Sequence, residues 1–190
     1  GAANTLIFGE GREILADNTD GFGFFENIEE SGIRINKTRP AVVIGAGGAS
    51  LAIVNVLESK GFPSVRIANR TRSRIDAIAD RYPGFVEPYD LNDAESALPG
   101  AGLIINTTSL GMNGQRPLSL DLSHAEDDAV ATDIVYTPLI TPFLERASAR
   151  GLATIDGLGM LLHQGRPGFK AWFGVMPEVD EELRSLMLAP

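Results

Sequence analysis

Residues 41–50 have the sequence AVVIGAGGAS, which is the strongest single indication of fold in this chain. Four strand-forming apolar residues lead into a glycine-rich turn, and helix-compatible residues follow. Within the turn, Gly45, Gly47 and Ser50 have the spacing G-x-G-x-x-small. In such a turn the first glycine permits a tight bend, the second lets the backbone approach a pyrophosphate, and the small residue allows close helix–strand packing. Because a strand precedes the turn and a helix follows it, we interpret it as a dinucleotide-binding βαβ unit rather than a simple structural turn.

The same alternation of short β-rich runs and helix-like segments is repeated along the middle of the chain. The predicted strands cover residues 41–44, 65–67, 103–105, 130–135 and 154–155, and the predicted helices cover residues 50–59, 73–81 and 142–149. Thr141 and Pro142 suit the N-cap and first position of the last of these helices. This alternation predicts an α/β fold, a Rossmann-type doubly wound parallel sheet.

The two ends of the chain have a different pattern. Residues 1–24 form no βαβ unit, and residues 32–40 are typical of a connector into the first sheet strand. We predict a short helix over residues 158–164 that is stopped by Gly165 and Pro167. The acidic residues 178–182 suit the first turn of a last helix. Both ends therefore resemble parts of a second, incomplete body.

Composition limits the classes of partner. The chain of 190 residues has 16 basic and 25 acidic residues, and its net charge of −9 argues against nucleic acid or an anionic membrane as the main partner. It contains no cysteine, which excludes disulfides, cysteine nucleophiles and thiolate metal sites. The longest weakly polar run, residues 41–57, includes three glycines and predicts no membrane span. The two scattered histidines, His124 and His163, predict no metal site; we expect His124 at the surface and His163 packed or facing solvent.

The residues after the second sheet strand indicate which dinucleotide is bound. An NAD-binding protein usually has an acidic residue there to hold the ribose 2′-hydroxyl. This chain has Asn69, Arg70, Thr71 and Arg74 instead. Arginine pairs with phosphate in a bidentate manner, so two guanidinium groups suit a 2′-phosphate. The alternative is a solvated basic helix start, but positive charge there opposes the helix dipole. We therefore predict NADP as the cofactor.

Seven motifs occur in the order found in shikimate dehydrogenases, and the chain resembles that family over nearly its whole length. The motifs are GAANTL, ADNTDGFG, VIGAGGAS, ANRT, INTTSLGM, DIVYTPLITPFL and DGLGMLLHQ. The resemblance implies reduction of 3-dehydroshikimate to shikimate by NADPH, in aromatic amino-acid biosynthesis, in a cytoplasmic monomer or homodimer. It also implies three parts: residues 1–20 from the end of a substrate domain, residues 21–156 as the NADP-binding Rossmann domain, and residues 157–190 as helices returning to the substrate domain.

The resemblance also implies roles for individual residues. Asp20 would be the catalytic carboxylate, working with a lysine in the family. The substrate-binding residues would be Asn4, Asp20, Tyr136 and Gln164. The cofactor-binding residues would be Gly45, Ala46, Gly47, Gly48, Ala49, Asn69, Arg70, Thr71, Arg74, Thr108, Ile134, Gly157 and Met160. These roles agree with the chemistry, since Asn, Gln, Tyr and Asp are suitable partners for the hydroxyls of a cyclic polyol.

Each assignment has a simpler structural interpretation. Asn4 would suit a turn, and Asp20 would suit the N-cap of a helix that starts near Gly21. Residues 107–109 would suit a loop after the third strand, although ligands bind at the carboxyl ends of such strands. Tyr136 and Gln164 would pass for residues at the rim of the core.

The family's catalytic lysine has no counterpart in the quoted motifs. The chain contains Lys37, Lys60 and Lys170, none of them in the family's N-V-T-x-P-x-K type of segment. We therefore expect a shortened form that keeps the Rossmann fold and binds NADP but has impaired catalysis. The alternatives are a quinate/shikimate dehydrogenase of broader specificity and a non-catalytic NADP-binding module.

Overall fold

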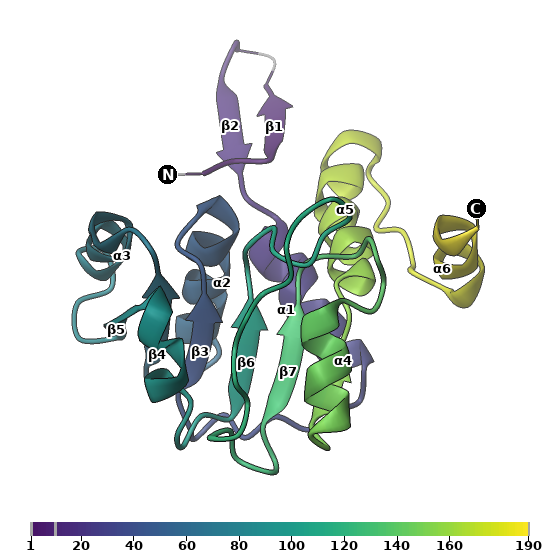
Figure 1. Ribbon diagram of the computed structural model, residues 1–190. Helices are drawn as coiled ribbons and strands as arrows, with labels where there is room; N and C mark the ends of the chain where they lie inside the picture. The colour runs from purple at the N-terminus through teal and green to yellow at the C-terminus, as the bar shows by residue number, and fades with distance from the viewer. Residues whose placement is uncertain (1, 10, 190) are drawn as a thin grey trace.

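A six-stranded parallel sheet forms the centre of the protein (Figure 1). The structure is a computed structural model, and it describes residues 2–9 and 11–189. The strand order is β5-β4-β3-β6-β7-β8, in which the chain runs outward in both directions from the centre. The strands are β3 (Ala41–Ile44), β4 (Val65–Asn69), β5 (Val86–Asp90), β6 (Leu103–Asn106), β7 (Val130–Asp133) and β8 (Ala153–Ile155). The predicted doubly wound parallel sheet is confirmed.

Helices cover both faces of the sheet. Side chains alternate along a strand, so Val43 of β3 belongs to one core and Val42 to the other. The first core includes residues of α1 (Asp20–Glu30), α2 (Gly48–Ser59), α3 (Arg72–Ala79) and α5 (Leu158–Phe173). The second core packs against the 3₁₀ helix η1 (Leu91–Ala97) and against α4 (Pro142–Ala149). This two-sided covering explains why β3 and β6 are wholly buried.

The start of α4 agrees with its predicted cap. Thr141 is the N-cap, and its Oγ1 accepts a hydrogen bond from the Leu144 N–H at 3.3 Å. Pro142 follows at the start of the helix, where its missing N–H leaves no bond unmade.

Strand β5 was not predicted from the sequence. Its residues, VEPYD, include a proline and two acids, which are unusual in a buried strand. β5 lies at the edge of the sheet, where Pro88 needs no second strand neighbour for its missing N–H. The position in the sheet, rather than the local sequence, makes this segment a strand.

Residues near the N-terminus form a hairpin that was also not predicted. β1 (Thr5–Phe8) pairs antiparallel with β2 (Ile14–Asp17), and the register joins Thr5 to Asp17 and Phe8 to Ile14. The hairpin projects beyond the sheet (Figure 1), and the side chains of Phe8, Ile14 and Leu15 are largely exposed.

The prediction that Gly165 and Pro167 stop the helix after residue 164 is wrong. α5 continues to Phe173 and includes Pro167. Proline inside a helix removes a hydrogen bond, at a cost of about 3 kcal/mol. Contacts distant in sequence offset this loss: Arg166 pairs with Glu26 of α1 at 2.9 Å, and the Trp172 indole N–H donates to the Leu6 carbonyl at 3.1 Å. The helix ends instead at Gly174, whose φ of 77° is left-handed.

The predicted last helix is present. α6 (Glu181–Leu188) begins after Asp180, whose side chain accepts a hydrogen bond from the Leu183 N–H at 2.8 Å. Glu181 and Glu182 occupy the first turn, where negative charge is favourable. No helix in the described ranges is long and apolar enough to cross a membrane.

Candidate active site

The carboxyl ends of the strands place the predicted site residues at one edge of the sheet. In Figure 1 the arrowheads of β3, β4, β6 and β7 point toward the edge from which the hairpin projects. Ligands of doubly wound sheets bind at this edge, beside the point where the strand order reverses. Here the reversal lies between β3 and β6, and the loops after these two strands include the predicted Gly45 and Thr108.

The loop after β3 has the geometry of a phosphate cradle. Gly45 has a φ of 110°, and a Cβ at this position would lie 2.7 Å from Thr107 Oγ1. Gly47 is the N-cap of α2, and a Cβ there would meet no atom within 4 Å. Gly47 and Gly48 are exposed, whereas Ala46 is buried. The turn therefore opens the first N–H groups of α2 to an approaching anion, as a pyrophosphate requires.

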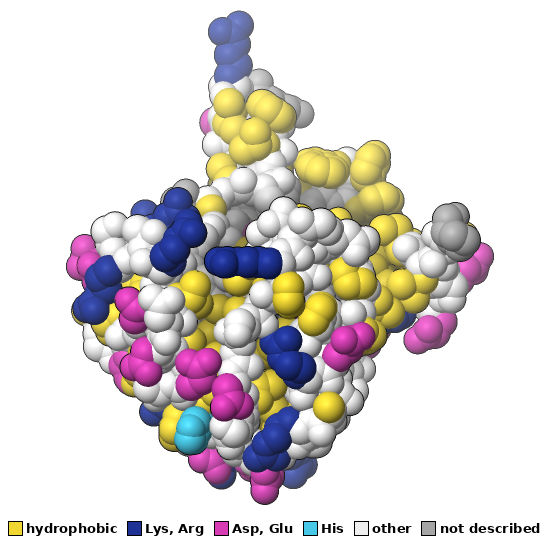
Figure 2. Space-filling view, viewed as in Figure 1, with side chains coloured by type: hydrophobic (Ala, Val, Ile, Leu, Met, Phe, Trp, Pro, Cys, Tyr) yellow, Lys and Arg dark blue, Asp and Glu magenta, His cyan; other side chains and the backbone are white. Residues whose placement is uncertain are grey.

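The loop after β4 and the first turn of α3 present two arginines to solvent. Arg70 and Arg74 are exposed, and neither forms an ion pair within the described residues. By contrast, Arg72 pairs with Asp76 at 2.8 Å. The Asn69 side chain donates to the Thr71 carbonyl at 2.9 Å and shapes the loop. In Figure 2, Lys and Arg side chains gather on the side of the molecule where Figure 1 shows α3.

A hollow of about 310 Å³ lies between the loops after β6 and β7. One wall includes Thr108 and the other includes Ile134 and Tyr136, so these three predicted residues meet at one hollow. Tyr136 is 44% exposed and lines the hollow. Gly157 lies behind this wall, since a Cβ there would approach the Ile134 carbonyl oxygen to 2.6 Å. Met160, predicted to face the cofactor, is buried in the first core.

The predicted substrate residues Asn4 and Asp20 are in direct contact. The Asn4 side-chain amide donates to Asp20 Oδ1 at 2.7 Å. The Asn4 side-chain oxygen accepts hydrogen bonds from the Thr19 N–H at 3.0 Å and from the Thr19 hydroxyl at 3.1 Å. Ala2 lies 3.9 Å from the Cβ position of Gly48, so the chain just before β1 lies beside the phosphate cradle.

Asp20 is not the N-cap that its simpler interpretation implied. Thr19 is the N-cap of α1, and Asp20 is the first helical residue. Its half-buried carboxyl group is held by Asn4. Gln164 lies on α5 against Gly23 of α1, because a Cβ on Gly23 would be 2.6 Å from the Gln164 N and Cβ atoms. Asn4 therefore contacts the first residue of α1, and the backbone of Gln164 packs against Gly23 in the same part of that helix.

A buried polar cluster around Asp133, beside the hollow, was not predicted from the sequence. Asp133 is 1% exposed and accepts hydrogen bonds from Asn106, Val135 and Thr141. Burial raises the pKa of the Asp133 carboxyl group, and these hydrogen bonds partly oppose that effect. A signal was available: Asn106 and Asp133 are the polar last residues of two otherwise largely apolar runs, LIIN and VATD.

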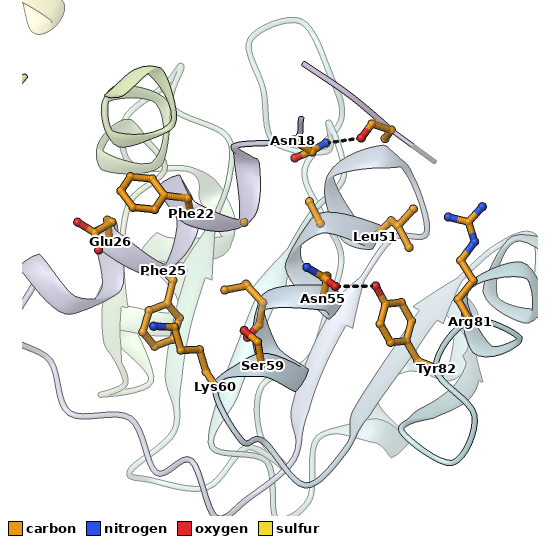
Figure 3. Close-up of a pocket in the computed structure, with 14 residues that line it drawn as sticks. Asn18, Phe22, Phe25, Glu26, Leu51, Asn55, Ser59, Lys60, Arg81 and Tyr82 are labelled. Carbon is orange, nitrogen blue, oxygen red and sulfur yellow. Dashed lines mark hydrogen bonds between the residues drawn. The ribbon is translucent and has the colours of Figure 1, made fainter. Parts of the chain in front are cut away.

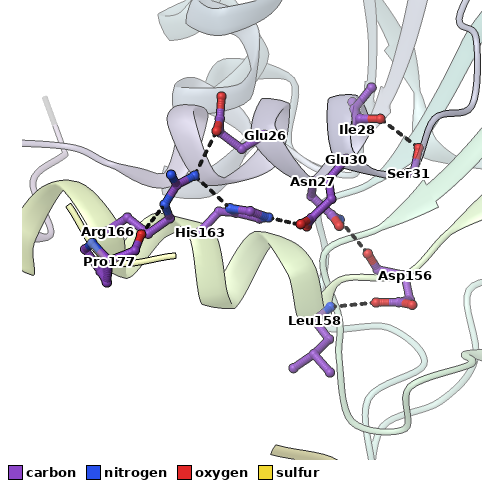
Figure 4. A network of polar contacts seen from close by, with 10 residues as sticks. All are labelled: Glu26, Asn27, Ile28, Glu30, Ser31, Asp156, Leu158, His163, Arg166 and Pro177. Atoms are coloured by element: carbon purple, nitrogen blue, oxygen red, sulfur yellow. Dashed lines mark hydrogen bonds and ion pairs between the residues drawn. The ribbon is translucent and has the colours of Figure 1, made fainter. Parts of the chain in front are cut away.

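A second polar network joins α1 to α5 (Figure 4). His163 is buried, and its Nε2 lies 2.6 Å from Glu30 Oε2. Arg166 donates to Glu26 Oε2 and to the Pro177 carbonyl, both at 2.9 Å. His163 is therefore a packed, hydrogen-bonded residue of the helix interface, while His124 is exposed as predicted. Within the described residues, no cluster of three or more His, Cys, Asp or Glu side chains is arranged to hold a metal ion.

A larger hollow of about 430 Å³ lies on the outer side of α1 and α2 (Figure 3). Asn55 accepts a hydrogen bond from the Tyr82 hydroxyl at 3.1 Å along its wall, and Lys60 lies over the Phe25 ring. None of the predicted cofactor or substrate side chains lines it. Part of its lining belongs to the quoted motifs GAANTL and ADNTDGFG, namely Ala2, Asn18, Gly21 and Phe22, whereas the rest lies outside the quoted motifs.

The parallel sheet, the open glycine turn and the hollow at the switch point define a dinucleotide-binding protein of the Rossmann type. Comparison with known proteins gives the family. A family model described as shikimate/quinate 5-dehydrogenase matches residues 29–138, and one for the shikimate 5′-dehydrogenase C-terminal domain matches residues 157–181. The chain belongs to the shikimate/quinate dehydrogenase family.

Relatives and solved structures agree with this membership. The shikimate dehydrogenases (NADP⁺) of Jannaschia sp. (strain CCS1) and Paracoccus denitrificans are 52% and 51% identical to the whole chain, which covers 68% and 67% of their lengths. The structure of quinate dehydrogenase from Corynebacterium glutamicum with NAD has a TM-score of 0.88 at 29% identity, over 98% of this chain and 67% of that one. Shikimate 5-dehydrogenase from Thermus thermophilus, with NADP(H) and shikimate, has a TM-score of 0.80 at 36% identity, over 94% and 64%.

Proposed function

We propose that this chain carries the NADP-dependent reduction of 3-dehydroshikimate to shikimate. The observation that carries the proposal is the contact between Asn4 and Asp20, at 2.7 Å, beside an open phosphate cradle. The relatives that are about half identical to this chain are named shikimate dehydrogenase (NADP⁺). A module that only held NADP would have no use for this pair, so the non-catalytic alternative is disfavoured.

Different residues at the edge of the sheet would bind different parts of the cofactor and the substrate. The glycine turn and the N-terminus of α2 would hold the pyrophosphate, and Arg70 and Arg74 would hold the 2′-phosphate. NADPH supplies the hydride when it is bound. Asn4, Tyr136 and Gln164 offer amide and hydroxyl groups to the hydroxyls of the substrate ring. Asp20 is the acidic group in this set, and its Oδ1 is held in place by the Asn4 amide.

This function is tested by incubating the purified chain with shikimate and NADP and following the absorbance of the NADPH that forms. We expect the chain to bind NADP and to oxidise shikimate slowly, because Asp20 forms no ion pair with a lysine in the described residues. Lys37 pairs with Glu29, and Lys60 lies over the Phe25 ring. Turnover at the rate of a full-length relative would refute the impairment. Absence of both turnover and NADP binding would refute the proposed function.

The preference for NADP over NAD follows from Arg70 and Arg74. We expect the double substitution Arg70→Ala/Arg74→Ala to weaken NADP binding by about 10- to 100-fold, since charge-assisted hydrogen bonds contribute roughly 1.5–3 kcal/mol. NAD binding should change little. Arg72→Ala is the matched control, because Arg72 is exposed in the same helix as Arg74 but pairs with Asp76.

Titration of each variant with both cofactors measures this preference. Equal losses for NADP and NAD would refute the 2′-phosphate role. Similar affinities of the unaltered chain for NADP and NAD would favour the quinate/shikimate alternative of broader cofactor use.

The remaining assignments belong to the same proposal. We propose a cytoplasmic enzyme, as the family implies and as a chain without cysteine permits, and a monomer or homodimer. Residues 21–156 would form the NADP-binding domain. Residues 1–20 and 157–190 would belong with the substrate domain, which agrees with the contact between the hairpin and α5 through Leu6 and Trp172.

A further inference from the structure

Two buried polar residues that the proposed reaction does not use lie side by side at the ends of β6 and β7. Asn106 and Asp133 are direct partners in the register of the two strands. Both are almost completely buried, at 0% and 1% exposure. The Asn106 amide nitrogen donates to both carboxylate oxygens of Asp133, at 3.0 and 3.1 Å. The pair therefore ties together the two strands at the edge where the ligands are expected.

Each member of the pair anchors one wall of the hollow between the loops. Asn106 Oδ1 accepts hydrogen bonds from the Thr108 N–H at 3.0 Å and from the Thr108 hydroxyl at 2.7 Å. Asp133 Oδ1 accepts a hydrogen bond from the Val135 N–H at 2.9 Å. Thr108 and Val135 both line the hollow. The bond between Asn106 and Asp133 thus links the two walls through side chains, next to the backbone bond from the Ile134 N–H to the Asn106 carbonyl at 3.1 Å.

The contacts of Asp133 match a carboxylate and no other side chain of similar size. Its second oxygen accepts a hydrogen bond from the Thr141 hydroxyl at 2.7 Å, which joins the start of α4 to the cluster. All its partners donate, so an amide in its place would set an N–H group against another donor. Hydrogen bonds to an ionised acceptor are also the strong ones. A neutral isostere would therefore loosen both walls without removing any atom that faces the hollow.

We propose that Asn106 and Asp133 form a positioning pair that fixes the walls receiving the nicotinamide half of NADP. Neither residue touches the cofactor; they act through Thr108 and Val135. The inference rests on the proposed function, because it assigns the hollow to the nicotinamide half. The adenosine half belongs to the loop after β4, which the pair does not contact. Loss of the pair should therefore affect the two halves of the cofactor unequally.

Two ligands separate the halves of the cofactor. NADPH has both halves, whereas adenosine 2′,5′-bisphosphate has only the adenosine half with its two phosphates. We expect Asp133→Asn to weaken NADPH binding about tenfold or more, and to change binding of the bisphosphate less than about twofold. Asp121→Asn is the matched control, because Asp121 also accepts hydrogen bonds from a backbone N–H and a hydroxyl, both of Ser123, but lies exposed at the surface. It should leave both affinities unchanged.

A milder pair of variants covers the case in which Asp133→Asn does not fold. Thr141→Val keeps the carboxylate but removes one donor to Asp133, together with the cap bond from the Leu144 N–H, while Thr141→Ser keeps the hydroxyl for both bonds. We expect Thr141→Val to weaken NADPH binding several-fold, on the order of one lost hydrogen bond, with the bisphosphate again unaffected. Thr141→Ser should restore NADPH binding. Circular dichroism shows whether Asp133→Asn is folded, and the Thr141 variants are used if it is not.

The outcomes distinguish this proposal from the proposed function. Equal weakening of both ligands would show a merely structural role, and unchanged NADPH binding would show none; either result overturns the positioning pair. If the unaltered chain bound neither ligand, the proposed function would fail, and amide hydrogen exchange would still test the pair. The Thr108 and Val135 amides should exchange faster in Asp133→Asn than in Asp121→Asn, and equal exchange would overturn the proposal.

Discussion

At the scale of single residues, Asp133 gives the stability of the chain a distinct dependence on pH. Burial raises the pKa of its carboxyl group in the folded state, against the opposing bonds from Val135, Asn106 and Thr141. The unfolded chain has the ordinary value of about 3.9. The folded state therefore binds this proton more tightly, and the contribution of Asp133 to the free energy of unfolding falls as the pH rises from the unfolded pKa through the folded one. Above that window it stays constant.

Replacing Asp133 by Asn isolates this effect. The free energy of unfolding of the unaltered chain minus that of Asp133→Asn should decrease as the pH rises through the window. Asp121→Asn should show the opposite trend, because hydrogen bonds from the Ser123 N–H and hydroxyl lower the pKa of Asp121. Its stabilising contribution is present above the unfolded pKa and is lost as the pH falls through the folded one. Urea unfolding at a series of pH values measures the two differences in the free energy of unfolding. Parallel trends for Asp133→Asn and Asp121→Asn would contradict the opposite pKa shifts of the two carboxyl groups.

Residues are predictable from sequence where a local pattern or a family motif defines them. The spacing of Gly45, Gly47 and Ser50 predicted the turn after β3, and its left-handed first glycine is as expected. Family motifs placed Asn4 and Asp20 in one predicted substrate site, whereas the hydrogen bond between them, across 16 positions, was not predicted from the sequence. The bond between Asn106 and Asp133 depends on the strand register, which no short stretch of sequence encodes.

At the scale of elements, α1 is held between α2 and α5 by glycines that allow close approach. A Cβ on Gly23 would lie 2.6 Å from the Met160 carbonyl oxygen and from the Gln164 backbone nitrogen on α5. Backbone atoms cannot move aside as a flexible side chain can. We therefore expect Gly23→Ala to lower the free energy of unfolding by about 1–3 kcal/mol, as other overpacking substitutions do. Thermal or urea unfolding measures it.

Gly165 supplies the matched control on the partner helix. It is exposed within α5, and a Cβ there would meet no atom within 4 Å. Gly165→Ala should therefore raise the free energy of unfolding by about 0.5–1 kcal/mol, because alanine favours the helix. Loss of stability in both variants would show that the Gly23 contact has no special role.

The same helix shows where element prediction from the sequence fails. The buried strands β3 and β6 and helix α4 were found because their apolar runs and caps are local signals. The second half of α5 was not, because Gly165 and Pro167 are local stop signals that lose to contacts with α1 and the hairpin. β5 was missed for a similar reason, since only its place at the sheet edge accommodates Pro88.

At the scale of the whole molecule, the hairpin presents apolar side chains to solvent. Phe8 is 72% and Leu15 62% exposed. Large exposed apolar patches promote association. We expect the chain to self-associate as its concentration rises, and Phe8→Thr/Leu15→Thr to reduce this association. Stability should change by less than about 0.5 kcal/mol per site, as is usual for exposed positions.

Sedimentation velocity over a range of concentrations tests this expectation. Ile140→Thr is the control, since Ile140 is 49% exposed but lies in the loop before α4, outside the hairpin. If association persisted in the hairpin variant but disappeared in Ile140→Thr, the contact between chains would lie near the loop before α4, and the expectation for the hairpin would be wrong.

The exposure of Arg70 and Arg74 also bears on how this family can diversify. Neither side chain supports the fold through an ion pair in the described chain, whereas the glycine turn and the Asn106–Asp133 pair are integral to the sheet edge. Substitution of these arginines is thus uncoupled from folding. A related chain can therefore exchange one dinucleotide for another through substitutions at these two exposed positions, with no loss of stability to compensate elsewhere in the cradle.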